Sequence, residues 1–302
     1  MKANEVFKKT IKFVWLKLAL GGCAIAFSIV LGLILIAISA ISKNTTVIGY
    51  SLMLWIVLSA AALGISQYYL GYVLKAGHIA VVTQLLTTGN LPEDQFEYGK
   101  QVVKKKFATA AAYFAVDRLV SGAVRQINGG LDIIGDVLGK IPGMDSLVSF
   151  AKSIVSIALG NVDECCLAYT FYQEEQSAFK SAADGVVIYF QNWKTILKDA
   201  LKTALIALVM SVAAWFLLML VTLAFLGVLG MPGFDMFFVA VILAVMIVLV
   251  VKSSVMDSYT MICMLCSYMQ VAPATEITFD LYDKLCKLSS KFKSLFKNAQ
   301  EA

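Results

Sequence analysis

The stretch "SAADGVVIYFQNWKTILKDALKTALIALVM" at 181–210 decides the fold, because it starts as a two-faced helix and ends without a single charge. Apolar residues recur at helical spacing from Ala182 to Leu201, and polar residues fall largely on the other face. The stretch therefore predicts a helix at a cytoplasmic membrane surface that leads into a spanning helix. Three of its side chains, an indole and two long ammonium groups, suit a membrane interface: Trp193, Lys194 and Lys198.

The composition of the whole chain agrees with a membrane environment. Hydrophobic residues make up 60% and charged residues 15% of the 302 residues, and the mean hydropathy is +0.80, which is outside the range of ordinary soluble domains. Three uncharged windows each exceed the roughly 20 residues that cross a bilayer: they lie between Lys17 and Lys43, between Lys43 and Lys75, and between Lys202 and Asp235. We therefore expect an all-α, polytopic membrane protein.

The distribution of lysines predicts the topology. Four spanning helices are expected in two hairpins, at about 16–42, 47–74, 201–230 and 236–256. Lys43 is the only cation in the two short outer loops, whereas many lysines lie on the opposite side. The positive-inside rule then places both termini and the central region in the cytoplasm. The plasma membrane is the expected location by default, not by deduction. We expect the first apolar segment to be a retained helix, since it is too long for a signal peptide core.

The chain divides into four consecutive segments. Residues 1–100 hold the first transmembrane hairpin, 101–190 a central cytoplasmic or partly inserted helical region, 191–275 the second hairpin, and 276–302 a basic amphipathic tail. The segments "KTIKFVWLKLAL" at 9–20 and "KTILKDALKTAL" at 194–205 share seven of twelve positions. The two hairpins are thus candidates for a parallel repeat, although lysine- and leucine-rich helices can also match by composition alone.

Two regions allow alternative interpretations. The helices of 107–180 either pack beneath the bundle or insert in part as a re-entrant or spanning pair. The tail carries an apolar stripe and a lysine-rich face, so it either lies on an anionic inner leaflet or packs on the protein's own core. In the first case Lys284 and Lys291 would lie at the membrane interface.

Patterns for catalysis or metal binding are weak. The sequence has one histidine, His78, and no P-loop, H-E-x-x-H or G-x-S-x-G motif. Cys263 and Cys266 form a C-x-x-C within an apolar run, far from the four ligands of a structural zinc site. We expect no enzyme activity, no cofactor, no metal and no nucleic-acid partner; the net charge of +5 orients the chain in the bilayer.

A family pattern is visible from 107 to about 270. Ala168 and Tyr169 are followed by a small-residue segment, a transmembrane hairpin and a small–Tyr–x–Met pattern; the remaining matching positions are Ser181, Ala182, Asp184, Gly185, Ile188, Asn192, Ser258, Tyr259 and Met261. This arrangement resembles the C-terminal part of the choline transporter-like family. The resemblance implies a membrane transporter of choline-like amines. The chain departs from the family in its short N-terminal half and in Met264, where an acidic residue is expected.

A quaternary amine is recognised by aromatic faces, typically with a carboxylate nearby. The residues that could supply such a site are Trp55, Tyr69, Tyr72, Trp215, Asp257 and Tyr259. Tyrosines and tryptophans near helix ends are also ordinary interfacial residues. Asp257 is the most informative of the set, because a carboxylate near a membrane helix is costly unless paired or functional. Lys252, five residues earlier, is expected to pair with it poorly.

Three functions fit these observations. The first is a transporter or facilitator for an organic cation, with the lipid bilayer as the permanent partner. The second is a channel formed by a homo-oligomer, because four helices in one chain make a thin bundle. The third is a scaffold subunit that transports nothing. The oligomeric state of the purified protein would separate the first two.

Overall fold

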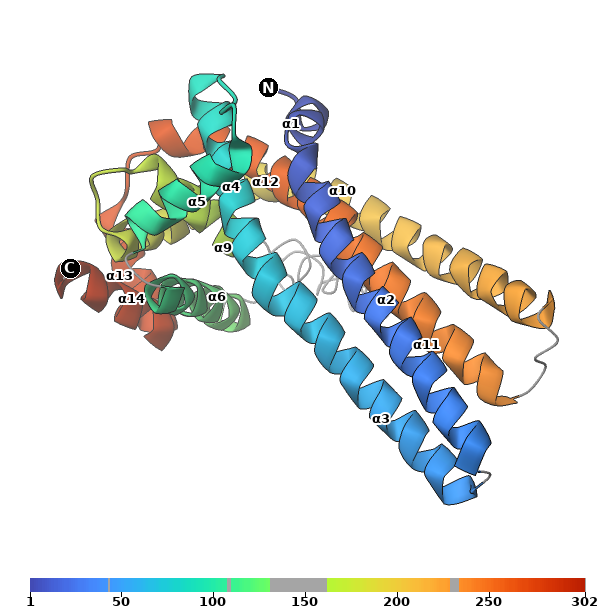
Figure 1. Ribbon diagram of the computed structural model, residues 1–302. Coiled ribbons are helices and arrows are strands. Elements are labelled where there is room, and N and C mark those ends of the chain that lie inside the picture. The colour runs from blue at the N-terminus through green and yellow to red at the C-terminus, as the bar shows by residue number, and fades with distance from the viewer. Residues whose placement is uncertain (43, 108–109, 131–161, 229–233, 302) are drawn as a thin grey trace, which may run out of the picture. The chain divides into compact units, whose positions relative to one another are not determined.

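The computed structural model describes residues 1–42, 44–107, 110–130, 162–228 and 234–301 (Figure 1). All regular structure in these ranges is helical, as the sequence predicts. The predicted helices that fall within 131–161 lie outside the described residues. The elements are α1 (Ala3–Lys9), α2 (Ile11–Ser42), α3 (Thr45–Gly64), η1 (Ile65–Leu70), α4 (Gly71–Thr88), α5 (Gln95–Lys106), α6 (Ala110–Gly130), α9 (Val162–Tyr172), α10 (Ala178–Val228), α11 (Phe234–Val251), η2 (Lys252–Met256), α12 (Asp257–Val271), η3 (Ala272–Ala274), α13 (Phe279–Leu288) and α14 (Ser290–Glu301).

The chain forms two compact units that alternate along the sequence. Unit 1 comprises Met1–Thr10, Ala76–Ile206 and Tyr259–Ala302, and unit 2 comprises Ile11–Lys75 and Ala207–Ser258. The four consecutive segments predicted above do not follow this division, since each unit is assembled from distant parts of the chain. Each unit is described by itself below.

Within the described residues, three helical stretches are long and apolar enough to cross a membrane. They are Ile11–Ser42, Thr45–Thr88 and Val241–Ala274. They overlap the predicted spans at 16–42, 47–74 and 236–256, and the second and third continue beyond the predicted ends to Thr88 and Ala274. The predicted span at 201–230 lies on α10, where the described side chains include a shorter apolar stretch, Val212–Val221.

Unit 2 is built on a hairpin of two long helices, α2 and α3, that lie side by side (Figure 1). The side chain of Asn44 begins α3 by accepting a hydrogen bond from the amide of Thr46, at 2.9 Å. Polar contacts then hold the helices together: Ser28 and Ser59 share a hydrogen bond of 2.7 Å, and Trp55 Nε1 donates to the carbonyl of Ser28 at 2.8 Å. In hydrocarbon such bonds and close packing replace the hydrophobic driving force of a soluble core.

In unit 1, the start of α10 differs from the half-buried helix that the sequence predicts. The predicted continuity is confirmed, since one helix runs from Ala178 to Val228. Residues 181–190 are nevertheless buried on every face, not on one stripe. Gly185 explains the burial, because a Cβ there would lie 3.0 Å from Cα of Cys166 on α9. Tyr268 of α12 also donates to the Gly185 carbonyl, at 3.2 Å.

The tail follows the second of its two interpretations. Helices α13 and α14 pack against α6 (Figure 1), and their apolar stripe is covered, with Leu285, Phe292 and Leu295 fully buried. These contacts favour packing on the protein's own core, although Leu288 of the stripe is 38% exposed, and contact of the tail with a membrane surface stays a prediction. The physical reason for this packing is that α6 offers its own apolar face, on which Val116, Val120, Ala123 and Ile127 are buried.

Candidate functional site

Two of the candidate spans contain a π-helical turn in their interior, between two α-helical segments. In η1 the amide of Gly71 bonds to the carbonyl of Ser66, and in η2 the amide of Asp257 bonds to the carbonyl of Lys252. Both are i→i+5 bonds, which widen the turn and re-aim its side chains. Single π-helical turns inside α-helices occur frequently at functional sites.

The two π-helical turns meet through their side chains. Ser253 Oγ lies 2.5 Å from Gln67 Oε1 and donates a hydrogen bond to it, and Ser253 Oγ also lies 3.1 Å from the Val250 carbonyl. Both turns pack against α2, where a Cβ at Gly21 would lie 3.0 Å from Gln67 Nε2. We call Ser66, Gln67, Ser253 and Ser254 the polar layer of unit 2.

Two hydroxyl groups of the polar layer are buried without a hydrogen-bond partner among the described residues, those of Ser66 and Ser254. Their side chains belong to residues that are 7% and 0% exposed. A serine in a membrane helix ordinarily bonds to the carbonyl four residues earlier. A buried hydroxyl without a hydrogen bond lowers the stability of the folded protein. A bound molecule or water could form hydrogen bonds with these two hydroxyl groups.

A buried ammonium group lies in the same unit. Lys17 is 8% exposed, and its Nζ donates to Ser258 Oγ at 2.9 Å. Lys17 and Gly21 are four residues apart and share one face of α2. An ionisable residue within a span usually marks a functional path, so Lys17 and the polar layer together form the candidate site.

Trp55 and Trp215 both make contacts with other side chains or backbone groups of the protein. Trp55 is 5% exposed, and its ring nitrogen fastens α3 to α2 through the Ser28 carbonyl. Trp215 is half-buried and stacks edge-to-face on Phe216, with ring centroids 4.9 Å apart. Tyr72 is partly exposed, and the side chain of Tyr69 lies outside the described residues.

Asp257 forms an ion pair with Lys252, which the sequence predicted to be a poor partner. Lys252 Nζ lies 2.8 Å from Asp257 Oδ1 and 3.1 Å from Oδ2. The expectation assumed α-helical geometry, in which residues five apart diverge. Because 252–256 form a π-helical turn, Lys252 and Asp257 come onto one face. Both side chains are about half exposed, at 47% and 50%.

Tyr259 belongs to unit 1, whereas Asp257 belongs to unit 2. Its hydroxyl donates to Asn4 Oδ1, and its ring meets that of Phe7 edge-to-face, with centroids 5.4 Å apart. No described contact joins Trp55, Trp215, Asp257 and Tyr259 into an aromatic cage. Binding of a quaternary amine by these residues stays a prediction.

The predicted interface residues are only partly described. Trp193 is partly exposed, Lys284 and Lys291 are exposed, and the side chains of Lys194 and Lys198 lie outside the described residues. Contact of these five residues with a bilayer stays a prediction.

Unit 1 contains a buried carboxylate that the sequence analysis had matched only to a family pattern. Asp184 is 1% exposed, and it accepts hydrogen bonds from Lys180 Nζ and from the hydroxyl of Tyr282. Burial, and then the bond to Asp184, raise the pKa of Tyr282 far above 10.0. The phenol therefore stays protonated and fixes α13 to α10.

The thiols of unit 1 show no activation. Burial raises the pKa of Cys165 and of Cys166 well above 9.0, which keeps both as unreactive thiols. Within the ranges that the structure describes, no three histidine, cysteine or acidic side chains are grouped as metal ligands would be.

The polar layer was not predicted from the sequence. Its signal is the pair of short polar doublets, Ser66–Gln67 and Ser253–Ser254, each inside an apolar helix that closes a predicted hairpin. Their matching positions agree with a parallel repeat, which remains a prediction.

Comparisons with known proteins give no further assignment. No protein-family model, no curated protein and no solved structure matches this chain. The resemblance to the choline transporter-like family stays a prediction based on the residues quoted above.

Proposed function

We propose that this protein is a multi-pass membrane transporter or facilitator that moves a small polar solute past the polar layer of unit 2. The observation that carries the proposal is the hydrogen bond between Gln67 and Ser253, which connects two π-helical turns inside candidate spans. Such turns interrupt the regular hydrogen bonding of a spanning helix. In transporters, interrupted helices commonly form the substrate site near the middle of the fold.

The buried hydroxyls of the polar layer support the same proposal. Polar side chains in a span are costly, and they persist where they line a solute path or bind one another. Gln67 and Ser253 bind one another, whereas Ser66 and Ser254 have no partner among the described residues. A passing solute with hydrogen-bonding groups would satisfy them.

The choice of solute follows the resemblance only in part. Choline-like amines are implied by the family pattern, but the aromatic residues expected to hold them are engaged in other contacts. The polar layer instead offers hydroxyl and amide groups, which suit a solute bound by hydrogen bonds. Choline is therefore one solute to test among several.

An oligomeric channel is the second candidate, and one observation favours it. The Lys252–Asp257 pair is half exposed within the candidate span Val241–Ala274. A charged pair on the outside of a spanning helix is costly in lipid, and a second copy of the chain would cover it. The mass of the purified protein in detergent separates the two candidates: a monomer or dimer supports the transporter, and a ring of four or more supports the channel.

Osmotic swelling of liposomes that contain the protein tests the proposal with solutes of different charge. The solutes are choline chloride, potassium acetate, glycine and glycerol, and swelling is followed by stopped-flow light scattering. We expect at least one solute to enter faster than it enters protein-free liposomes. Entry of all four at the protein-free rate, with the protein shown to be folded and inserted, would overturn the proposal.

A further inference from the structure

Unit 1 carries a basic cluster that the transport proposal does not use. Arg118, Gly122 and Arg125 recur on α6 at i, i+4 and i+7, so they lie on one face of the helix. Both arginines are exposed. Lys291 of α14 reaches this face: a Cβ at Gly122 would lie 3.1 Å from its Cγ. The aliphatic part of Lys291 therefore crosses α6 between the two arginines.

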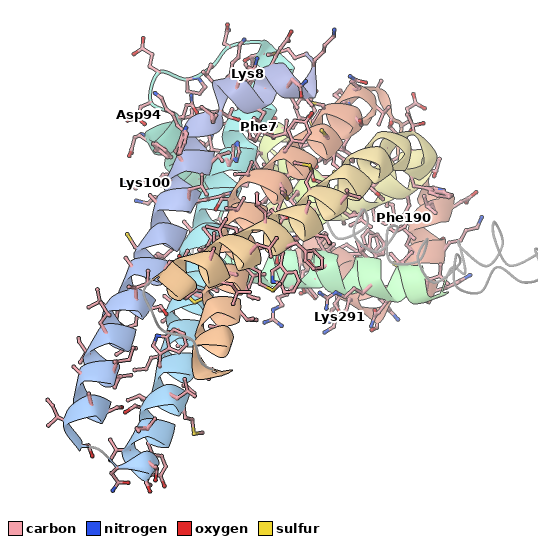
Figure 2. The ribbon with its side chains drawn as sticks, turned by 90° about the vertical axis from the view of Figure 1, so that its right-hand side faces the viewer. Phe7, Lys8, Asp94, Lys100, Phe190 and Lys291 are labelled. Carbon is pink, nitrogen blue, oxygen red and sulfur yellow. The ribbon has the colours of Figure 1, made fainter. Side chains whose placement is uncertain are left out.

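The position of Lys291 is fixed by its backbone. Gln126 Oε1 accepts hydrogen bonds from the Lys291 amide at 3.0 Å and from Ser289 Oγ at 2.7 Å. Phe292, the next residue, is fully buried. Figure 2 shows Lys291 beside α6. The glycine and the glutamine thus place the backbone and Cγ of Lys291 against the α6 face that carries the two arginines.

Two acidic residues near the cluster, Asp117 and Glu301, also interact with groups outside it. Asp117, next to Arg118, acts on the buried thiol of Cys166 in α9, whose pKa it helps to raise. On α14, Glu301 pairs with Lys297 at 3.6 Å. Among the described residues, Arg118, Arg125 and Lys291 bring three positive charges to this surface.

We infer that Arg118, Arg125 and Lys291 bind the phosphate groups of anionic lipids at the surface of a bilayer. Guanidinium groups pair with phosphate oxygens in a bidentate geometry, and clusters of basic residues attract anionic headgroups. The bilayer is the anionic partner that a chain with three candidate spans already meets. Because the apolar stripe of the tail is buried against α6, this attachment depends on charge and not on insertion.

The test uses the full chain in detergent micelles, titrated with fluorescent phosphatidylglycerol and, separately, phosphatidylcholine. The variant combines Arg118→Gln, Arg125→Gln and Lys291→Gln. Its control removes the same charge from α5 by Lys100→Gln, Lys104→Gln and Lys105→Gln, all exposed positions of unit 1. Each basic residue near an anionic surface strengthens attachment about fivefold. We therefore expect the cluster variant to lose at least tenfold in phosphatidylglycerol affinity, and the control to lose less than threefold.

Additional variants and a competition measurement test the same inference. Arg118→Lys with Arg125→Lys retains the charges and should retain most of the binding. If the triple variant does not fold, Arg125→Gln alone should reduce the dependence of binding on salt. Equal loss in the cluster and control variants would overturn the inference. So would equal binding of the two lipids by the wild type, or full competition by millimolar inorganic phosphate, which would indicate a site for a soluble anion.

Discussion

Gln67 and Ser253 are 186 residues apart in the sequence, yet Oγ of Ser253 lies 2.5 Å from Oε1 of Gln67. The bond joins the π-helical turn of the first hairpin to that of the last span. Ser253 also bonds within its own helix, to the Val250 carbonyl, whereas the bond to Gln67 links two helices. The contact therefore joins two segments that are distant in the sequence and that both pack against α2. The polar layer that contains it is the part of the molecule at which the transport proposal can be tested.

Removing this bond should change transport more than stability. Ser253→Ala deletes a part-buried hydrogen bond of about 1 kcal/mol, which corresponds to about a fivefold change in rate if the bond shapes the path. Ser59→Ala is the matched control, because it deletes a serine hydrogen bond of 2.7 Å between α2 and α3. We expect similar thermal unfolding of the two variants and slower solute entry only for Ser253→Ala. Equal entry rates would place the path elsewhere.

Gly21 should be intolerant of any side chain. A Cβ there would lie 2.3 Å from Val250 Cγ1, so Gly21→Ala should reduce the free energy of unfolding by about 1–3 kcal/mol through overpacking. Gly22→Ala is the control, since nothing lies within 4 Å of its Cβ position. Thermal unfolding in detergent measures both variants. Adding Val250→Ala should restore the Gly21→Ala variant, and failure of that rescue would contradict the packing described.

Lys106 should matter more than its neighbour Lys105. Lys106 Nζ donates to the carbonyls of Gln173 and Gln176, the latter at 2.6 Å, whereas Lys105 makes an exposed ion pair with Glu174. Lys106→Met should cost about 1–3 kcal/mol by leaving these carbonyls unsatisfied. Lys105→Met should cost less than about 1 kcal/mol. Chemical denaturation at pH 7 compares the two.

The difference in folding stability between wild type and Lys106→Met should depend on pH in a predictable direction. Burial lowers the pKa of Lys106 below its ordinary 10.5, so the folded state releases this proton before the unfolded state does. Folding stability should therefore rise as the pH climbs from the lowered pKa toward 10.5. The stability difference between wild type and Lys106→Met should widen over that interval, and a narrowing difference would contradict the burial of the ammonium group.

Tyr282→Phe should loosen the tail while leaving its packing intact. The ring still meets Phe292 and Phe296, with centroids 5.6 and 4.9 Å away, but the buried carboxylate of Asp184 loses one donor. A hydrogen bond to a charged group contributes about 1.5–3 kcal/mol. Limited proteolysis should then cut the tail faster. Tyr98→Phe is the control, because that hydroxyl bonds to a part-buried Gln84 at 3.0 Å.

Apolar windows and charge placement were sufficient to predict the helices of unit 2. The runs after Lys17 and after Lys43 become α2 and α3, because a segment without charges has few alternatives to a spanning or buried helix. The continuity of α10 also followed from an uninterrupted helical pattern. The positions of these helices and the continuity of α10 depend on local composition, which can be read directly from the sequence.

Features that depend on close approach between helices were not predictable from periodicity. The burial of 181–190 on all faces requires Gly185 against Cys166, and the Lys252–Asp257 pair requires a π-helical turn. A π-helical turn arises from how one helix meets its neighbours, and regular spacing rules assume its absence. The aromatic residues were assigned to ligand binding for their chemistry, whereas Trp55 serves to join two helices.

Modification of Ser254→Cys tests most directly whether solute passes the polar layer. Ser254 is fully buried, and its hydroxyl has no partner among the described residues. The variant and the wild type, whose native thiols give the background, are treated in liposomes with a methanethiosulfonate that carries a quaternary ammonium group. We predict that the reagent modifies Cys at 254, as intact mass shows, and blocks solute entry in the variant only. Unchanged entry after complete modification at this position would contradict the account.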